Sequence, residues 1–258
     1  MKTELVRRLT PEEEELAAKR DELVLLEAQL ADEELALASL KAELAAFEGL
    51  YLRRVGILYA ELDEWTARLA EFKAQKIATP EADSEAAAAR AQAEESYSAA
   101  HSEAAEARPV TLSPELKKLY REAAKRVHPD TASNDADRAR RERLMKEVNV
   151  AYGRGDENEL RRILANLDSS PDAVQGLGVG ADLIRVLRQL RQIRDRIAAI
   201  ELEIAGLAET DLAKLKAKAD LAAVQGLDLL AEMATSVQGR INVVRQQFDS
   251  ESNKGENA

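Results

Sequence analysis

The chain has 258 residues, enough for one or two domains, and a formal net charge of −11, which disfavours a nucleic-acid binder. It contains no cysteine, which excludes a disulfide framework, a thiolate metal site and a cysteine nucleophile. Aromatic residues make up only 3% of the chain, whereas Ala, Glu, Leu, Lys and Arg dominate. This composition is typical of long helices and coiled coils, so we expect an all-α fold.

No stretch of eighteen apolar residues occurs, and residues 1–15 lack the apolar core of a signal peptide. We therefore expect a soluble, cytoplasmic protein without a membrane partner. The two histidines lie far apart in the sequence, and no glycine-rich segment has the spacing of a nucleotide-binding loop. The sequence thus predicts no enzyme, no catalytic residues, no cofactor and no metal site.

Residues 1–78 are expected to form an N-terminal coiled-coil helix. The helix begins at Thr10-Pro11-Glu12-Glu13, a capping threonine with a glutamate three residues later. We expect one continuous helix over 11–76, roughly 100 Å long, because no proline interrupts it; several shorter packed helices are the alternative. Apolar residues recur every seven positions, at Leu9, Leu16, Leu23, Leu30, Leu37, Leu44, Tyr51, Leu58, Trp65 and Phe72.

The heptad pattern changes near Tyr51, where apolar residues follow one another in two steps of four. Phe47, Tyr51 and Val55 carry this change, and Gly56 lies beside it. Such a stutter is expected to unwind a supercoil locally.

Residues 79–109 form a segment rich in Ala and Glu, with a second helix start at Thr79-Pro80. Its helix propensity is high, but Tyr97 is its only large apolar side chain. We expect either a thin helical spacer or a helix that packs closely through its alanines. His101, in the same segment, is expected to be solvated.

Residues 114–127 predict an amphipathic helix. Ser113 can cap it, Pro114 fits its first turn, and Pro129 ends it because the residue before a proline disfavours the α conformation. Apolar residues occupy one face and basic residues another: Leu116, Leu119, Tyr120, Ala123 and Val127 on the first, and Lys117, Arg121 and Lys125, with Lys118 and Arg126 beside them, on the second.

This segment resembles the second helix and the loop of a J-domain, the module by which co-chaperones engage DnaK-type ATPase chaperones. The family's loop reads His-Pro-Asp, and its helix commonly reads KKAYR followed by an alanine and a basic residue. The matching positions here are Lys117, Lys118, Tyr120, Arg121, Ala124 and Arg126 in the helix and His128, Pro129 and Asp130 in the loop. The resemblance implies that the chaperone-binding residues are His128, Pro129, Asp130, Lys117, Lys118, Arg121, Lys125 and Arg126.

Residues 137–152 resemble the third helix of a J-domain, which often ends FKEINEAY. Met145 replaces the phenylalanine, and the other matches are Lys146, Glu147, Val148, Asn149, Ala151 and Tyr152. This helix is expected to pack antiparallel against 114–127, and 157–164 to form a short fourth helix, which gives a J-domain-like region over 110–167.

Three features depart from the family pattern. No counterpart of the first J-domain helix precedes Ser113, so either the domain is trimmed or another helix of the chain fills that side of its core. Glu122 and Thr131 stand where the family commonly has basic residues, which weakens the positive surface.

The remaining segments are a linker, a second long helix and a tail. Residues 168–181 contain three glycines and are expected to be a flexible linker. Residues 182–250 resume the heptads and are expected to form a C-terminal coiled-coil helix, although the pattern is lost over 208–226. Residues 251–258 are expected to be a disordered tail.

Four arginines, Arg185, Arg188, Arg191 and Arg194, recur every three residues in the second long helix. They are expected either to pair with acidic residues or to form a docking surface for an acidic partner. Examples of such acidic residues are found in the Ala-rich segment: Glu81, Asp83, Glu85, Glu94 and Glu95.

The predicted fold is therefore long coiled-coil helices that flank a small J-domain-like helical hairpin. We expect the two long helices to pair antiparallel within one chain, with a homodimer of parallel like helices as the alternative. The resemblance implies a co-chaperone that stimulates ATP hydrolysis by a DnaK-type partner, while the coiled coil recruits an unknown client or sets location. The alternative is a structural scaffold or tether whose J-like domain mediates assembly only.

Overall fold

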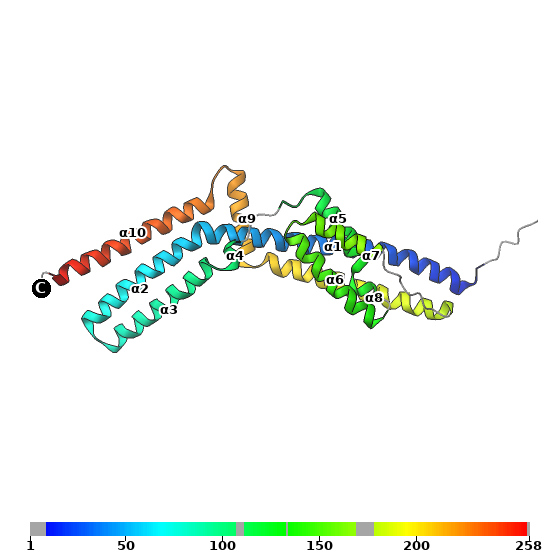
Figure 1. The fold of residues 1–258 in the computed structure, drawn as a ribbon, viewed down its shortest axis with the longest axis horizontal. Helices are drawn as coiled ribbons and strands as arrows, with labels where there is room; N and C mark the ends of the chain where they lie inside the picture. Colours follow the sequence, from blue (N-terminus) through cyan, green and yellow to red (C-terminus); the bar gives the residue numbers. More distant parts are fainter. Residues whose placement is uncertain (1–8, 107–110, 133, 169–177, 257–258) are drawn as a thin grey trace, which may run out of the picture. The chain divides into compact units, whose positions relative to one another are not determined.

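The computed structural model describes residues 9–106, 111–132, 134–168 and 178–256, and within these ranges every regular element is a helix (Figure 1). The predicted all-α fold is confirmed. None of the described helices has the length and apolar character that a membrane span requires. The elements are α1 Pro11–Tyr51, a π-helical segment η1 Leu52–Gly56, α2 Ile57–Ile77, α3 Pro80–Ala100, α4 Glu103–Glu106, α5 Pro114–Val127, a 3₁₀ turn η2 Pro129–Thr131, α6 Asp135–Gly153, α7 Glu157–Asp168, α8 Val179–Ala208, α9 Asp211–Val224 and α10 Leu229–Glu256.

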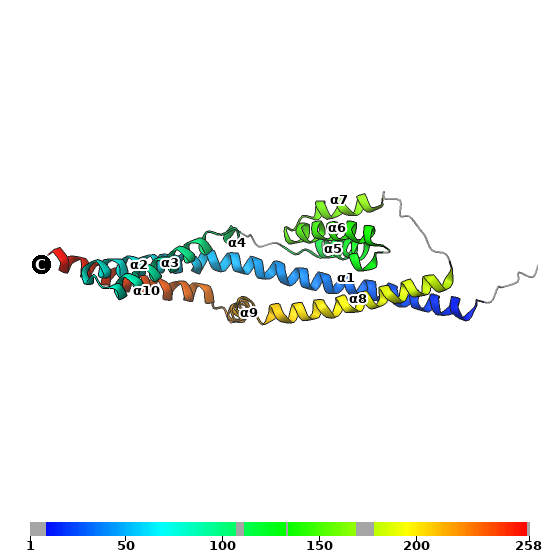
Figure 2. The ribbon, with the colours of Figure 1, turned by 90° about the horizontal axis from the view of Figure 1, so that it is seen from below.

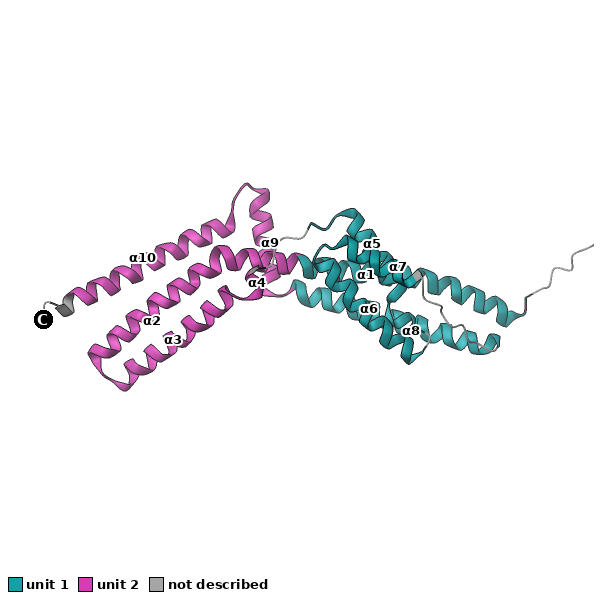
Figure 3. Cartoon of the chain, in the orientation of Figure 1, with its two compact units in different colours: residues 1–42, 110–208 teal, residues 43–109, 209–258 magenta. Residues whose placement is uncertain are grey.

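Two compact units make up the chain, and each combines segments that lie far apart in the sequence (Figure 3). Unit 1 contains residues 1–42 and 110–208, and unit 2 contains residues 43–109 and 209–258. The J-domain-like region therefore shares a unit with the first part of α1 and with α8. The sequence had instead divided the chain into consecutive segments.

The first helix begins at Thr10 as predicted. The Thr10 amide donates to Glu13 Oε2 at 2.9 Å, and the Glu13 amide donates to Thr10 Oγ1 at 3.3 Å, which completes the capping box. Helical backbone then continues to Ile77, which confirms the single long helix. Its π-helical segment begins directly after Tyr51, where the heptads stutter, because a wider turn absorbs the extra step of four.

In unit 1, α1 and α8 pair in parallel, so the predicted antiparallel pairing is wrong. Arg20 pairs with Asp182 at 3.2 Å near the start of both helices, and Lys41 pairs with Glu203 at 2.6 Å near their ends. Heptad spacing defines an apolar seam but not its direction, so the sequence left the direction open. The residues buried in this seam are Leu16, Leu30, Leu37, Val186, Leu190, Ile193, Ile197 and Ile200.

The J-domain-like region is a three-helix bundle in which α5 and α6 form the predicted antiparallel hairpin. Tyr120 of α5 lies against Tyr152 near the end of α6, with ring centroids 4.6 Å apart, and the Arg126 carbonyl accepts from Arg141 near its start. The third helix is α7, which packs on both. Figure 2 shows α7 and α1 on opposite sides of the hairpin. The core comprises Leu116, Leu119, Tyr120, Ala123, Ala124, Val127, Met145, Val148, Ala151, Tyr152, Leu160, Ile163 and Leu164, joined by Ala31 and Leu35 of α1.

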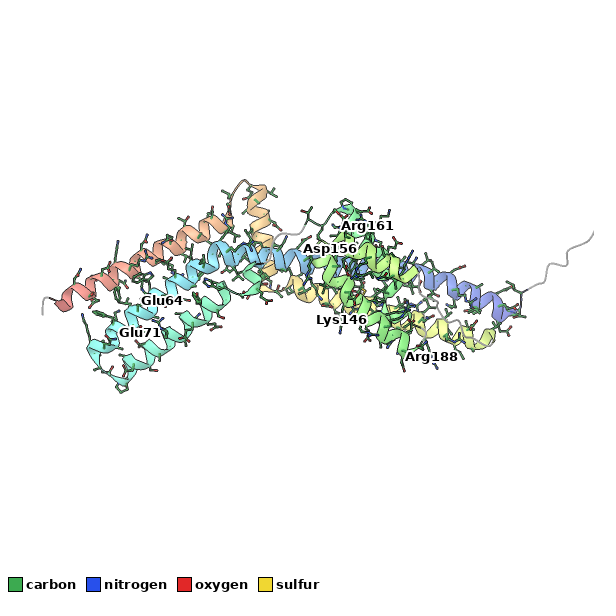
Figure 4. The ribbon with its side chains drawn as sticks, in the orientation of Figure 1. Glu64, Glu71, Lys146, Asp156, Arg161 and Arg188 are labelled. Atoms are coloured by element: carbon green, nitrogen blue, oxygen red, sulfur yellow. The ribbon has the colours of Figure 1, made fainter. Side chains whose placement is uncertain are left out.

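In unit 2, α3 packs against α2 through alanines, as one of the two predicted alternatives stated. The small side chains on each helix are buried and seven residues apart, which lets the backbones approach closely. Arg90 of α3 also donates to Glu64 at 2.5 Å and to Glu71 at 2.7 Å, two residues of α2 that Figure 4 labels. The buried alanines are Ala60, Ala67 and Ala74 on α2 and Ala86, Ala93 and Ala100 on α3.

The predicted helix over 182–250 is instead three helices, α8, α9 and α10. Thr210 accepts a hydrogen bond from the Ala213 amide and starts α9, and Gly226 turns the chain with a φ of 77° before α10. The predicted linker is also shorter, since α8 begins at Val179; residues 169–177 lie outside the described range. The predicted tail is helical to Glu256, because nothing breaks α10 after Phe248.

Candidate functional site

The His128-Pro129-Asp130 loop lies at the tip of the α5–α6 hairpin and forms a turn held by its own hydrogen bonds. The Asp130 amide donates to His128 Nδ1 at 3.2 Å, and Thr131 Oγ1 donates to the His128 carbonyl at 2.8 Å. His128 itself has left the helix, with φ −63° and ψ 128°, as expected before a proline. The local sequence therefore fixes the shape of the loop.

His128 does not face solvent: only 3% of its surface is exposed. Its Nε2 lies 3.1 Å from Oε1 of Glu34, a residue of α1 that is 4% exposed. Because Nδ1 accepts a hydrogen bond, Nε2 carries the proton in the neutral imidazole and donates to the glutamate. Arg196 of α8 donates to the same oxygen at 2.8 Å. We call His128, Glu34 and Arg196 the buried triad, after its first two members; the Arg196 side chain is 34% exposed.

Opposing effects act on the pKa of Glu34. Burial raises its pKa, but the hydrogen bond from His128 and the ion pair with Arg196 outweigh burial, so that the pKa lies below its ordinary value. The carboxylate is therefore stabilised as an anion within unit 1. A buried charge of this kind contributes to stability only while both partners remain in place.

This shift predicts an acid-dependent loss of stability. A depressed pKa stabilises the fold above the unfolded-state pKa, and the contribution disappears as pH falls through the folded value. Glu34→Gln is expected to lower the free energy of unfolding by about 1–3 kcal/mol at pH 7, and by much less near about pH 3. Urea unfolding of both proteins at the two pH values measures this. An equal difference at both would show that the Glu34 charge does not stabilise the fold.

The other two loop residues are half-buried. Asp130 Oδ1 lies 3.7 Å from Arg138 of α6, a long ion pair. Beyond the loop, Gln189 of α8 donates to the Thr131 carbonyl at 3.3 Å. Both α1 and α8 thus contact the tip of the hairpin.

The predicted basic residues of α5 lie near acidic side chains of α1. Arg121 pairs with Asp32. Burial raises the pKa of Glu27, and the nearby positive charge of Lys125 acts in the opposite direction. Arg126 pairs within its own helix with Glu122 at 3.0 Å. Among the predicted site residues of the helix, Lys118, Arg121, Lys125 and Arg126 are exposed and Lys117 is half-buried.

Sequence reasoning missed Glu34 and Arg196, and it assigned Tyr120 to the apolar face of its helix without a role in this site. Tyr120 is completely buried, donates to Asn149 Oδ1 at 2.7 Å, and has its hydroxyl 3.4 Å from the Glu34 carbonyl. Burial raises the pKa of this phenol. Glu34 and Arg196 are charged residues of long helices, and no local pattern distinguishes them from solvated ones. Only the fold brings them to His128.

Three of the four arginines of α8 have other partners than those the sequence suggested. Arg185 pairs with Asp182 at 2.8 Å, Arg191 with Asp195 at 3.7 Å, and Arg194 with Glu22 of α1. Arg188 lies on the same helix (Figure 4). Three of the arginines thus pair with acidic residues, as one of the two predicted alternatives stated, although with others than the examples from the Ala-rich segment. His101 is exposed as expected, stacked on Tyr97 at 4.1 Å.

Comparison with known proteins gave no relatives: no protein-family model, curated protein or solved structure matches this chain. The chemistry of the site therefore has to be inferred from its own residues. These offer hydrogen bonds, a tyrosine and a set of cations, which are groups suited to contact with another protein.

Proposed function

We propose that this protein is a J-type co-chaperone, which stimulates ATP hydrolysis by a DnaK-type chaperone. One observation carries the proposal: an antiparallel hairpin holds His128, Pro129 and Asp130 in a hydrogen-bonded turn at its tip, directly after a helix rich in exposed cations. Exposed Lys118, Arg121, Lys125 and Arg126 would attract an acidic partner surface. The chain itself would perform no chemistry in this role, and the coiled coil would recruit the client or set the location in the cytoplasm.

Steady-state ATP turnover by a DnaK-type chaperone tests the proposal. We expect turnover to rise with the wild type and to lose this rise with His128→Gln, because loss of a central contact costs about 2 kcal/mol, or about 30-fold in affinity. The matched control is His101→Gln, which changes the other, exposed histidine. The proposal fails if turnover stays at its basal value with the wild type and also with the Glu34→Lys variant introduced below.

A structural scaffold is the second candidate, and the burial of His128 favours it. In that case the loop would serve only to attach the bundle to α1 and α8 through the buried triad. A scaffold would self-associate or bind a partner through its coiled coil, and ATP turnover by the chaperone would be the same with and without it. Sedimentation of the wild type, together with the turnover assay, separates the two candidates.

A further inference from the structure

Part of the predicted chaperone-binding surface is already covered by α1, which buries His128 and pairs with Arg121. Tyr120 on α5 and His128, which directly follows that helix, both contact Glu34. The neighbouring cation Arg121 pairs with Asp32. Basic residues of α5 thus meet acidic residues of α1, the same charge complementarity that an acidic partner would use.

The contact with α1 adds little to the core of the bundle. Three helices, α5, α6 and α7, supply almost all of its buried apolar side chains, whereas α1 contributes only Ala31 and Leu35, with Ala38 partly buried. Since α7 and α1 lie on opposite sides of the hairpin (Figure 2), separation from α1 would leave the contacts of α7 intact.

The coiled coil is equally independent of the bundle. Its seam is formed by Leu30 and Leu37 of α1 with Ile193, Ile197 and Ile200 of α8, which are different residues from those that face the bundle. Each half of unit 1 therefore has an apolar core made largely of its own residues. A contact built in this way is suited to open and close.

We propose that the acidic segment Glu27–Leu35 of α1, with Arg196 of α8, is an internal competitor that occupies the chaperone-binding face of α5 and holds the protein in an inactive state. This proposal rests on the proposed function. A DnaK-type partner would bind only the fraction of molecules in which the bundle has separated from α1, so the closed state weakens apparent affinity by that fraction. Separation would expose Tyr120, a residue type common at the centre of protein interfaces.

Charge reversal at Glu34 tests the proposal. Glu34→Lys places a cation beside Arg196 and His128 and is expected to raise apparent affinity for the chaperone by at least about tenfold, measured from the concentration dependence of ATP turnover. The matched control is Glu22→Lys, since Glu22 lies on the same helix but pairs with Arg194 and not with the bundle. If Glu34→Lys and the wild type have equal affinities, and His128→Gln removes the stimulation by both, the internal competitor is overturned but the proposed function is kept.

A crosslink covers the case in which Glu34→Lys fails to fold. The chain has no cysteine, so Thr131→Cys with Gln189→Cys introduces one reactive pair where the Gln189 side chain and the Thr131 carbonyl are 3.3 Å apart. A short bifunctional maleimide should join them in the closed state. We expect the crosslinked protein to lose stimulation that the same variant shows before crosslinking, whereas unchanged stimulation would overturn the proposal. If neither the uncrosslinked variant nor Glu34→Lys stimulates, the proposed function fails, and the internal competitor fails with it.

Discussion

Tyr120→Ala is expected to lower the free energy of unfolding of unit 1 by about 3–5 kcal/mol, as for other buried aromatic residues replaced by alanine. The side chain is completely buried, lies against Tyr152 with ring centroids 4.6 Å apart, and donates to Asn149 at 2.7 Å. Its loss would leave a cavity between the hairpin and α1. Urea unfolding followed by circular dichroism of the full chain measures the effect.

Two further variants make this prediction specific. Tyr120→Phe keeps the ring and loses the hydroxyl, so its cost should be only about 1 kcal/mol. Tyr97→Ala removes a tyrosine that is 61% exposed, and its effect should stay within about 0.5 kcal/mol. A loss for Tyr120→Ala no greater than that for Tyr97→Ala would contradict the packing of α5 against α6 and α1.

The fold could be predicted where local rules determine it. The capping residues, the prolines at helix starts and the seven-residue repeat predict where α1, α3 and α5 begin. The stutter at Tyr51 also marks the position directly before the π-helical segment. These features depend on residues at most a few turns apart, so a single sequence contains them.

Direction, partners and some boundaries could not be predicted, because they depend on residues far apart in the chain. An apolar seam by itself does not define a direction, and contacts such as the ion pairs Arg20–Asp182 and Lys41–Glu203 show that α1 and α8 are parallel. The heptads lost over 208–226 indicated irregularity but not that α9 would be a separate helix. The polar end of α10 appeared disordered by composition, yet composition does not stop a helix that is already formed.

The candidate site was predicted only in part for the same reason. Motif spacing identified the loop and the basic helix, and the hairpin places these residues together. Motif spacing could not reveal that His128 would lie against Glu34, which is 94 residues earlier in the chain. Burial of a residue predicted to contact a partner is the main difference between the sequence and the structure.

The reactivity of the two histidines measures this burial directly. His128 is 3% exposed within the buried triad, whereas His101 is exposed on α3 beside Tyr97. Treatment with diethyl pyrocarbonate, followed by mass spectrometry of the peptides, should modify His128 at least about tenfold more slowly than His101, since each 1.4 kcal/mol needed to open a contact slows access about tenfold. Glu34→Lys should bring the His128 rate close to that of His101. Equal rates for the two histidines in the wild type would contradict the docking of the loop on α1 and α8.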